Sequence, residues 1–166
     1  YSGPVVDDDE MVAAIHTLLF GNWITSGGEV AKFEIQYSKV VNNKFSVMVN
    51  SGSSADLVMM AGLKKFLNWQ DNDEIIISVV GFPTTLSSVT LNNLKPIFID
   101  IEMDTLNFDL DLVEKALQRE GNKIKAIYIS PVLGNPPDFD RLIELKEKYN
   151  IELILDGCDS LGSKWN

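Results

Sequence analysis

Histidine and cysteine are almost absent from this chain, and their scarcity excludes several kinds of catalytic site. The 166 residues contain one His, His16, and one Cys, Cys158. A single Cys can form neither an intrachain disulfide nor a metal site made of cysteines alone, and we predict no metal site. Hydrolases with a Ser-His-Asp or Cys-His arrangement have little material here. We expect His16 to be structural, because it follows the apolar Ile15 on a predicted helix.

Basic residues and long apolar runs are also scarce. There are 14 Lys and Arg residues against 24 Asp and Glu, a formal net charge of −10. Nucleic-acid-binding proteins usually carry a basic surface, so we expect no nucleic-acid partner, although backbone dipoles could still hold one phosphate. No apolar run approaches the roughly 20 residues that span a bilayer, and no signal-peptide pattern opens the chain. We therefore expect no membrane partner and a cytoplasmic location.

Residues 1–45 are predicted to form an N-terminal helical segment. Apolar side chains recur there at helical spacing in two places, and the acidic residues 7–10 are expected to start the first helix. The Gly- and Ser-containing stretch 21–28 predicts a loop between the two helices. The residues that carry these two patterns are Met11, Ile15, Leu18 and Leu19, followed by Val30, Phe33, Tyr37, Val40 and Val41.

From residue 46 to residue 166, short β-branched runs alternate with amphipathic helical patterns. Near-continuous apolar strands predict a sheet covered on both faces, and the alternation predicts mostly parallel pairing. The fold class is therefore α/β, with three layers (α/β/α). The predicted strands are Ser46–Asn50, Glu74–Val79, Pro96–Ile101, Ile124–Ser130 and Ile151–Asp156; the predicted helices are Ser53–Leu67, Thr84–Leu94, Asp109–Arg119 and Phe139–Tyr149.

Polar and Gly-rich loops follow several of these strands, and ligands of open α/β sheets bind at the carboxyl ends of strands. Ser51–Ala55 combines hydroxyls with a Gly at a strand-to-helix turn, where free N–H groups and the helix dipole favour a phosphate. The alternative is that Ser51 or Ser53 only caps the helix. The segment is neither a Walker A loop nor a G-x-G-x-x-G loop.

Asp156 ends an apolar strand, where a lone buried charge would be costly without a partner. It could pair with a cationic ring nitrogen, cap the next turn or bind a metal. Phe82, in a Gly-Phe-Pro turn, could form the wall of a flat-ring pocket or belong to the core. Asn135 could contact a polar ligand, or it could be present only because turns favour Asn for conformational reasons. Asp159, taken alone, is expected to be solvated or capping.

Taken in order, these segments resemble the DegT–DnrJ–StrS family of fold-type I PLP enzymes, which are mostly sugar aminotransferases. The similarity extends from about residue 10 to the end of the chain. It implies the PLP-binding large domain of a fold-type I transferase, whose first part would be residues 46–166. The motifs that carry it are Trp23–Gly27 (WITSG), Asn50–Leu57 (NSGSSADL), Val80–Thr85 (VGFPTT), Leu133–Asn135 (LGN) and Asp156–Gly162 (DGCDSLG).

Within the family, the details look like the NDP-hexulose 3-dehydrases. Most of the aminotransferases carry Ala-Ala or similar, then His or Gln, after the strand-end Asp, whereas this chain has Gly157-Cys158-Asp159. The dehydrases remove the C3 hydroxyl of a nucleotide-linked 4-keto-6-deoxy sugar in deoxysugar and lipopolysaccharide synthesis. They use PMP and replace the Schiff-base Lys with His. Relatives are homodimers, so the resemblance also implies a homodimer.

The resemblance assigns roles residue by residue. Phe82 would stack on the pyridine ring, Asp156 would pair with the protonated ring nitrogen, and Asp159 would lie near the phenolic oxygen. The cofactor would be PLP or PMP and the substrate a nucleotide-linked sugar. The phosphate would be held by Gly52, Ser53, Ser54 and Ala55, and the substrate would be contacted by Trp23, Ser26 and Asn135.

No catalytic residue is assigned within the chain. The Schiff-base Lys or dehydrase His is expected beyond Asn166, because Lys164 is too close to Asp156 and follows the wrong element. The rest of the large domain and the small domain are likewise expected to lie outside these residues, and we expect no turnover by the chain alone.

Two other hypotheses stay open. One is a non-catalytic truncated domain that folds and self-associates without chemistry. The other is an α/β protein that binds a nucleotide or phosphate without PLP.

Overall fold

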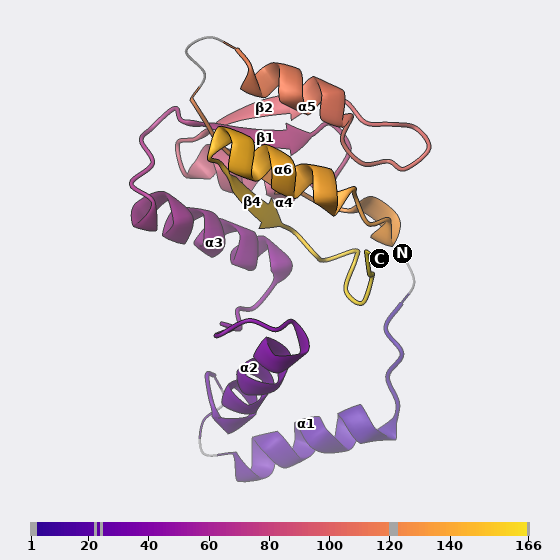
Figure 1. Ribbon diagram of the computed structural model, residues 1–166. Helices are drawn as coiled ribbons and strands as arrows, with labels where there is room; N and C mark the ends of the chain where they lie inside the picture. The colour runs from indigo at the N-terminus through magenta and orange to yellow at the C-terminus, as the bar shows by residue number, and fades with distance from the viewer. Residues whose placement is uncertain (1–2, 22, 24, 120–122, 166) are drawn as a thin grey trace. The chain divides into compact units, whose positions relative to one another are not determined.

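The computed structural model of the protein describes residues 3–21, 23, 25–119 and 123–165. The chain divides into two units, Tyr1–Val49 (unit 1) and Asn50–Asn166 (unit 2) (Figure 1). Unit 1 contains two helices, and unit 2 contains a parallel sheet with helices on both faces. No helix in the described ranges is long and apolar enough to cross a membrane.

The two helices of unit 1 are α1 (Asp8–Phe20) and α2 (Gly28–Val40), as the apolar spacing predicts. α1 begins with a capping box: Asp7 accepts from the N–H of Asp9 at 3.0 Å, and its own N–H donates to Glu10 at 2.8 Å. These bonds satisfy donors that have no partner inside the helix. Neither helix contains a buried residue, so local signals rather than burial define them.

The predicted strand Ser46–Asn50 is wrong. No strand is formed there, and Val47 is 78% exposed. The segment instead contacts α2, because the Ser46 hydroxyl donates to the carbonyl oxygen of Glu34, and the N–H of Met48 donates to the Glu34 carboxylate at 2.8 Å. An alternating apolar pattern makes a strand only where a neighbouring strand pairs with it.

The remaining four predicted strands are confirmed to within two residues at either end. All four pair in parallel, in the order β2-β1-β3-β4. Ile76 in β1 lies opposite Ile97 in β2 and Ile127 in β3. The strands are β1 (Glu74–Ser78), β2 (Lys95–Ile99), β3 (Ile124–Ile129) and β4 (Glu152–Leu155).

The four predicted helices of unit 2 are confirmed as well. α4 ends three residues before the predicted Leu94, because Asn93 takes a left-handed conformation with φ of 57°. A short 3-10 turn, η1 (Val132–Gly134), follows β3. The helices are α3 (Gly52–Phe66), α4 (Pro83–Leu91), α5 (Leu110–Leu117) and α6 (Phe139–Tyr149).

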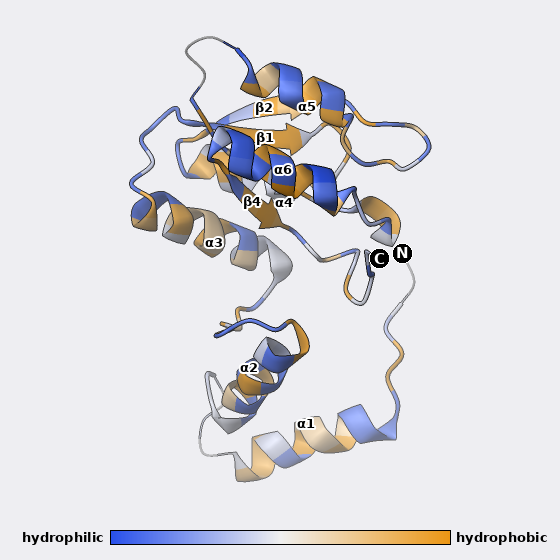
Figure 2. Cartoon of the chain, in the orientation of Figure 1, coloured by the Kyte–Doolittle hydropathy of each residue, from blue (hydrophilic) through white to orange (hydrophobic). Residues whose placement is uncertain are grey.

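Alternate residues of the strands enter two separate cores, which confirms the three-layer α/β/α architecture. Ile75 and Ile77 pack with Met60 of α3 and Val89 of α4 on one face of the sheet. On the other face, residues such as Ile76 and Ile127 pack with α5 and α6. The strands are accordingly apolar on both sides, while α5 and α6 turn polar residues outward (Figure 2).

The strand order places a topological switch between β1 and β3. After β1 the chain continues to β2, which lies at one edge of the sheet. After β3 it continues to β4, which lies at the opposite edge. The loops after β1 and β3 therefore diverge at the carboxyl ends of these strands, where open α/β sheets bind ligands.

Candidate functional site

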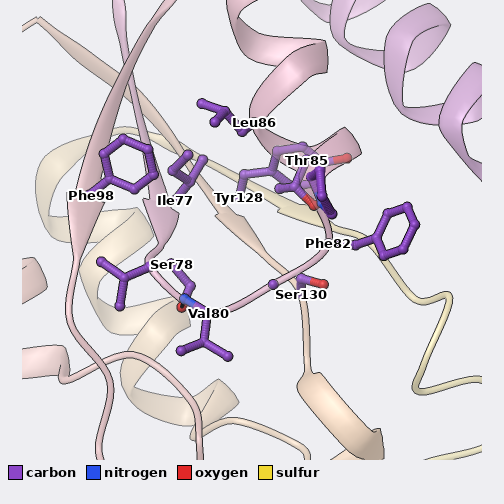
Figure 3. A pocket seen from close by; sticks show the side chains of 12 residues that line it. Ile77, Ser78, Val80, Phe82, Thr85, Leu86, Phe98, Tyr128 and Ser130 are labelled. Atoms are coloured by element: carbon purple, nitrogen blue, oxygen red, sulfur yellow. Dashed lines mark hydrogen bonds between the residues drawn. The ribbon is translucent and has the colours of Figure 1, made fainter.

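A hollow of about 200 Å³ lies at this switch point (Figure 3). It is lined by the end of β1, the loop Val79–Phe82, the start of α4 and residues of β2 and β3. Phe82 is the N-cap of α4, and its side chain is 55% exposed, so it does not belong to the core. In Figure 3 its ring stands apart from the other labelled side chains.

The first turn of α3 is a second part of the site. Ser51 caps the helix, and its hydroxyl oxygen accepts from the N–H of Ser54 at 3.2 Å. The capping interpretation is therefore confirmed for Ser51. Within the described chain, the N–H groups of Gly52 and Ser53 have no protein acceptor. Free N–H groups at the positive end of a helix can still take an anion.

Gly52 brings this helix start against the loop that follows β4. A Cβ placed on Gly52 would lie 2.8 Å from the Sγ of Cys158, which is closer than real Cβ contacts. A side chain at position 52 would therefore require the Cys158 thiol or the backbone to move. The predicted phosphate segment and the predicted ring-nitrogen partner are consequently neighbours.

Asp156 is only 6% exposed, and its backbone N–H continues the β3–β4 ladder by donating to Ile129 at 2.8 Å. Its carboxylate accepts from the Thr85 hydroxyl at 3.3 Å and from the N–H of Cys158 at 3.1 Å. The second bond is the turn-capping role that the sequence left open. No Lys or Arg of the described residues forms an ion pair with it. A buried carboxylate without a cation is suited to accept one.

The two residues after Gly157, Cys158 and Asp159, are both exposed. Partial burial of the thiol, together with the nearby Asp156 carboxylate, raises the pKa of Cys158 to about 11. The thiol is therefore protonated at neutral pH and is a poor nucleophile. Asp159 is exposed, and its carbonyl oxygen would lie 3.2 Å from a Cβ on Gly134, which places the two loops against each other.

Asn135 lies in the loop after β3, and its side chain binds the protein itself. Its Nδ2 donates to the carbonyl oxygen of Thr105 at 3.2 Å, while the Nδ2 of Asn107 donates to the Asn135 carbonyl at 3.2 Å. Leu133 and Gly134 both have positive φ, of 56° and 80°. The conformational interpretation of this Leu-Gly-Asn turn is therefore supported directly.

The two remaining predicted site residues, Trp23 and Ser26, belong to unit 1, whereas all the others belong to unit 2. Trp23 is 67% exposed and lines a hollow of unit 1 together with His16 and Phe20. The ring of His16 lies 5.0 Å from that of Phe20, in keeping with a structural role.

The sequence interpretation missed three residues that surround Asp156. Thr85 donates to it, and both Asp56 and Tyr128 lie close enough to interact with it electrostatically. One signal was available for Asp56: it shares a helical face with Met60, which is fully buried. A carboxylate on an apolar helix face requires an explanation.

Residues 5–166 match the sequence profile of the DegT/DnrJ/EryC1/StrS aminotransferase family. The chain belongs to this family. The match covers nearly the whole chain and confirms the resemblance found in the motifs.

Several relatives of this DegT/DnrJ/EryC1/StrS chain are 3-dehydratases. A GDP-4-keto-6-deoxy-D-mannose 3-dehydratase of Yersinia pseudotuberculosis is 35% identical, over 96% of this chain and 40% of the relative. The solved E. coli GDP-4-keto-6-deoxy-D-mannose-3-dehydratase with bound hydrated PLP is 33% identical with a TM-score of 0.86, over 99% of this chain and 42% of that one. A mutant GDP-4-keto-6-deoxymannose-3-dehydratase with bound GDP-perosamine is 34% identical, with a TM-score of 0.90 and the same coverage. The chain spans about 40% of the length of these relatives.

Proposed function

We propose that this chain supplies the cofactor-binding part of a PLP- or PMP-dependent enzyme that acts on nucleotide-linked keto-sugars. The observation that carries the proposal is Asp156: a buried carboxylate with no cationic partner among the described residues, beside a helix start with free N–H groups. A pyridoxal-type cofactor has a complementary anionic phosphate and cationic ring nitrogen.

The residues present fit such a group. Gly52, Ser53, Ser54 and Ala55 would hold the phosphate at the start of α3, since helix N-termini bind anions. The exposed ring of Phe82 would cover one face of the pyridine. Asp156 would take the ring nitrogen, and the exposed Asp159 would approach the phenolic oxygen.

When bound, the ring supplies an electron sink for carbanion chemistry at the substrate. The contribution of this chain is to hold a proton at the ring nitrogen. The Asp156 carboxylate is fixed for that task from two sides, by the Thr85 hydroxyl and by the N–H of Cys158. Two fixed bonds orient the carboxylate before the cofactor arrives, which lowers the cost of binding.

Within the family, we favour the 3-dehydratase reaction over amino transfer. Support comes from the Cys158-Asp159 pair and from the 3-dehydratase relatives at 33–35% identity. The substrate would be a nucleotide-linked 4-keto-6-deoxy sugar, with Trp23 and Ser26 as candidate contacts. Asn135 is a weaker candidate, because its amide already binds Thr105. By analogy with the family we also propose a homodimer.

Titration of the 166-residue chain with PMP and with PLP, followed by cofactor absorbance and fluorescence, tests the proposal. We expect a saturable spectral change that Asp156→Ala and Asp156→Asn reduce by tenfold or more in affinity. Asp104→Ala removes an exposed carboxyl and serves as the matched control. No saturable change with the unaltered chain, or equal binding by Asp156→Ala, would contradict the proposal.

One observation favours a second candidate, a self-associating domain without chemistry. In the described sheet, β2 pairs only with β1 and β4 only with β3, and such edges can pair with another chain. Sedimentation velocity, which measures self-association, distinguishes the two candidate functions when it is combined with the cofactor titration. Concentration-dependent association without cofactor binding supports the second candidate, whereas cofactor binding supports the first.

A further inference from the structure

A second carboxyl group lies buried beside Asp156, and nothing in the proposed chemistry uses it. Asp56, in the second turn of α3, is 5% exposed. It lies close enough to Asp156 for the two charges to interact, and it forms no ion pair with any Lys or Arg that the structure describes. Buried Asp residues are rare unless they are paired.

Different elements supply the groups that face Asp56. Thr84, at the start of α4, donates its hydroxyl to Asp56 at 3.1 Å. The titratable groups are Tyr128 of β3, Asp156 after β4 and Cys158 in the following loop. None of them carries a positive charge that could compensate a carboxylate.

Tyr128 is the phenol that interacts with this pair of acids. Its side chain is fully buried on the α3–α4 face of the sheet, and its hydroxyl has no hydrogen-bond partner of normal geometry among the described residues. A buried hydroxyl without a partner is costly. The Tyr128 hydroxyl can donate to either form of the Asp56 carboxyl, and only the protonated form can also donate back to it. Figure 3 shows Tyr128 and Thr85, the residue that binds Asp156, among the side chains that line one hollow.

The donors decide which of the two acids is charged. Asp156 accepts two hydrogen bonds, from Thr85 and Cys158, whereas Asp56 accepts one of normal geometry, from Thr84. Two like charges in one buried site cannot both form without a large cost. Burial raises the pKa of Asp56 and outweighs the lowering effect of Tyr128; the nearby Asp156 charge raises the pKa further, against a smaller lowering effect of Thr84.

We propose that Asp56 holds a proton in the folded protein and acts as a positioning residue for Asp156, so that the pair carries one negative charge. That charge is on Asp156, where it matches a single cationic ring nitrogen. The assignment to a ring nitrogen rests on the proposed function. The protonation of Asp56, by contrast, is a property of the protein without any cofactor. Ionisation of Asp56 would place a second, uncompensated charge in the same buried site.

The direct test is ¹³C NMR of the aspartate side-chain carboxyl carbons in the 166-residue chain, as a function of pH. Asp56→Asn assigns the Asp56 signal. We expect this signal to titrate with a midpoint at least one pH unit above the ordinary value for aspartate, about 3.9. A midpoint at or below that value overturns the proposal.

The stability of Asp56→Asn gives a second readout. A raised pKa in the folded state means that the native protein loses stability as pH rises from about 3.9 to the folded pKa, and is level above it. Asn mimics the neutral acid, so Asp56→Asn should become more stable than the unaltered chain over that pH range. The gain should be about tenfold in the unfolding equilibrium constant for each unit of raised pKa. The control Asp104→Asn should show no such gain, and a profile for Asp56→Asn parallel to that of the unaltered chain overturns the proposal.

Addition of PMP separates this inference from the proposed function. A bound cationic ring nitrogen should lower the Asp56 midpoint, because it compensates the second charge. If PMP binds and the midpoint does not move, the positioning role is wrong. If PMP does not bind, the proposed function fails. A raised Asp56 midpoint in the free protein would still establish that Asp56 holds a proton.

Discussion

The two units of this chain both contain helices, yet the interactions that stabilise these helices differ. In unit 1, α1 has a complete capping box but no buried residue. In unit 2, α6 is also capped, with Asp138 accepting from the N–H of Arg141, and it additionally buries Leu142 and Leu145 against the sheet. Capping signals act within one turn, whereas burial requires a second element to pack against.

The predicted site residues are also divided unequally between the two units. Every predicted cofactor residue lies in unit 2, at the ends of strands and the starts of helices that the two cores hold in place. Unit 1 contributes only the candidate substrate residues Trp23 and Ser26. We therefore expect changes in unit 2 to affect stability and cofactor binding, and changes in unit 1 to remain local.

The largest contrast should come from truncating one core side chain. Ile127→Ala removes a fully buried residue from the centre of the sheet, and should lower the free energy of unfolding of unit 2 by about 2–5 kcal/mol. Leu18→Ala, at a position 68% exposed on α1, should change it by less than about 0.5 kcal/mol. Urea unfolding followed by circular dichroism measures both. Similar losses for the two variants would show that unit 1 shares the core.

A smaller effect tests the close approach within the site. Gly52→Ala should cost about 1–3 kcal/mol of stability and weaken PMP binding, because the new methyl meets the Cys158 thiol. Adding Cys158→Ala should restore much of the loss. Gly62→Ala is the matched control in the same helix: its Cβ meets nothing within 4 Å, so the variant should gain about 0.5–1 kcal/mol. Failure of the double variant to recover would contradict the contact.

The pH dependence of unit 2 should include a contribution of about 1 kcal/mol from Glu74. Burial alone would raise the pKa of Glu74, but Lys95 at 3.0 Å and Arg119 at 2.6 Å outweigh it and lower the pKa. A lowered pKa stabilises the fold above about pH 4.5, and the benefit is lost as pH falls through the folded value. Glu74→Gln should flatten this part of the urea-unfolding profile between pH 3 and 6. Glu144→Gln, at an exposed position on α6, is the control, and equal effects would refute the assignment.

The smallest global effect should come from the cap of α1. Asp7→Ala removes the acceptor for the N–H of Asp9 and should destabilise α1 by about 1 kcal/mol. Amide exchange in α1 should become faster, while the urea midpoint of unit 2 stays unchanged. A shift of that midpoint by as much as Ile127→Ala produces would mean that the two units unfold as one.

Much of unit 2 follows from local pattern. The apolar runs of β1 and β3 have lengths and flanking turns that predict buried strands, and Asp109 and Asp138 mark the starts of α5 and α6. Residues 46–50 show where such reasoning fails. The β-branched pattern there is genuine, but pairing depends on a neighbouring strand, and the polar groups of this segment bond to Glu34 instead.

The site was only partly predictable for the same reason. Asp156 and the α3 turn could be found because each lies at a boundary between a strand and a helix, where ligands bind. Asp56 and Tyr128 lie inside regular elements, so their chemistry exists only once α3 and β3 come together. The contact between Gly52 and Cys158 joins residues more than a hundred positions apart, so no local sequence pattern predicts it.

The central claim is that the cofactor site of this chain is assembled within unit 2. Backbone amide chemical shifts of the ¹⁵N-labelled 166-residue chain, recorded during a PMP titration, test it directly. We predict saturable shifts clustered at the start of α3, at Phe82–Thr85 and at Asp156–Asp159, with α1 unmoved and the cluster lost in Asp156→Ala. Shifts centred on α1 or α2, or no saturable shift anywhere, would contradict it.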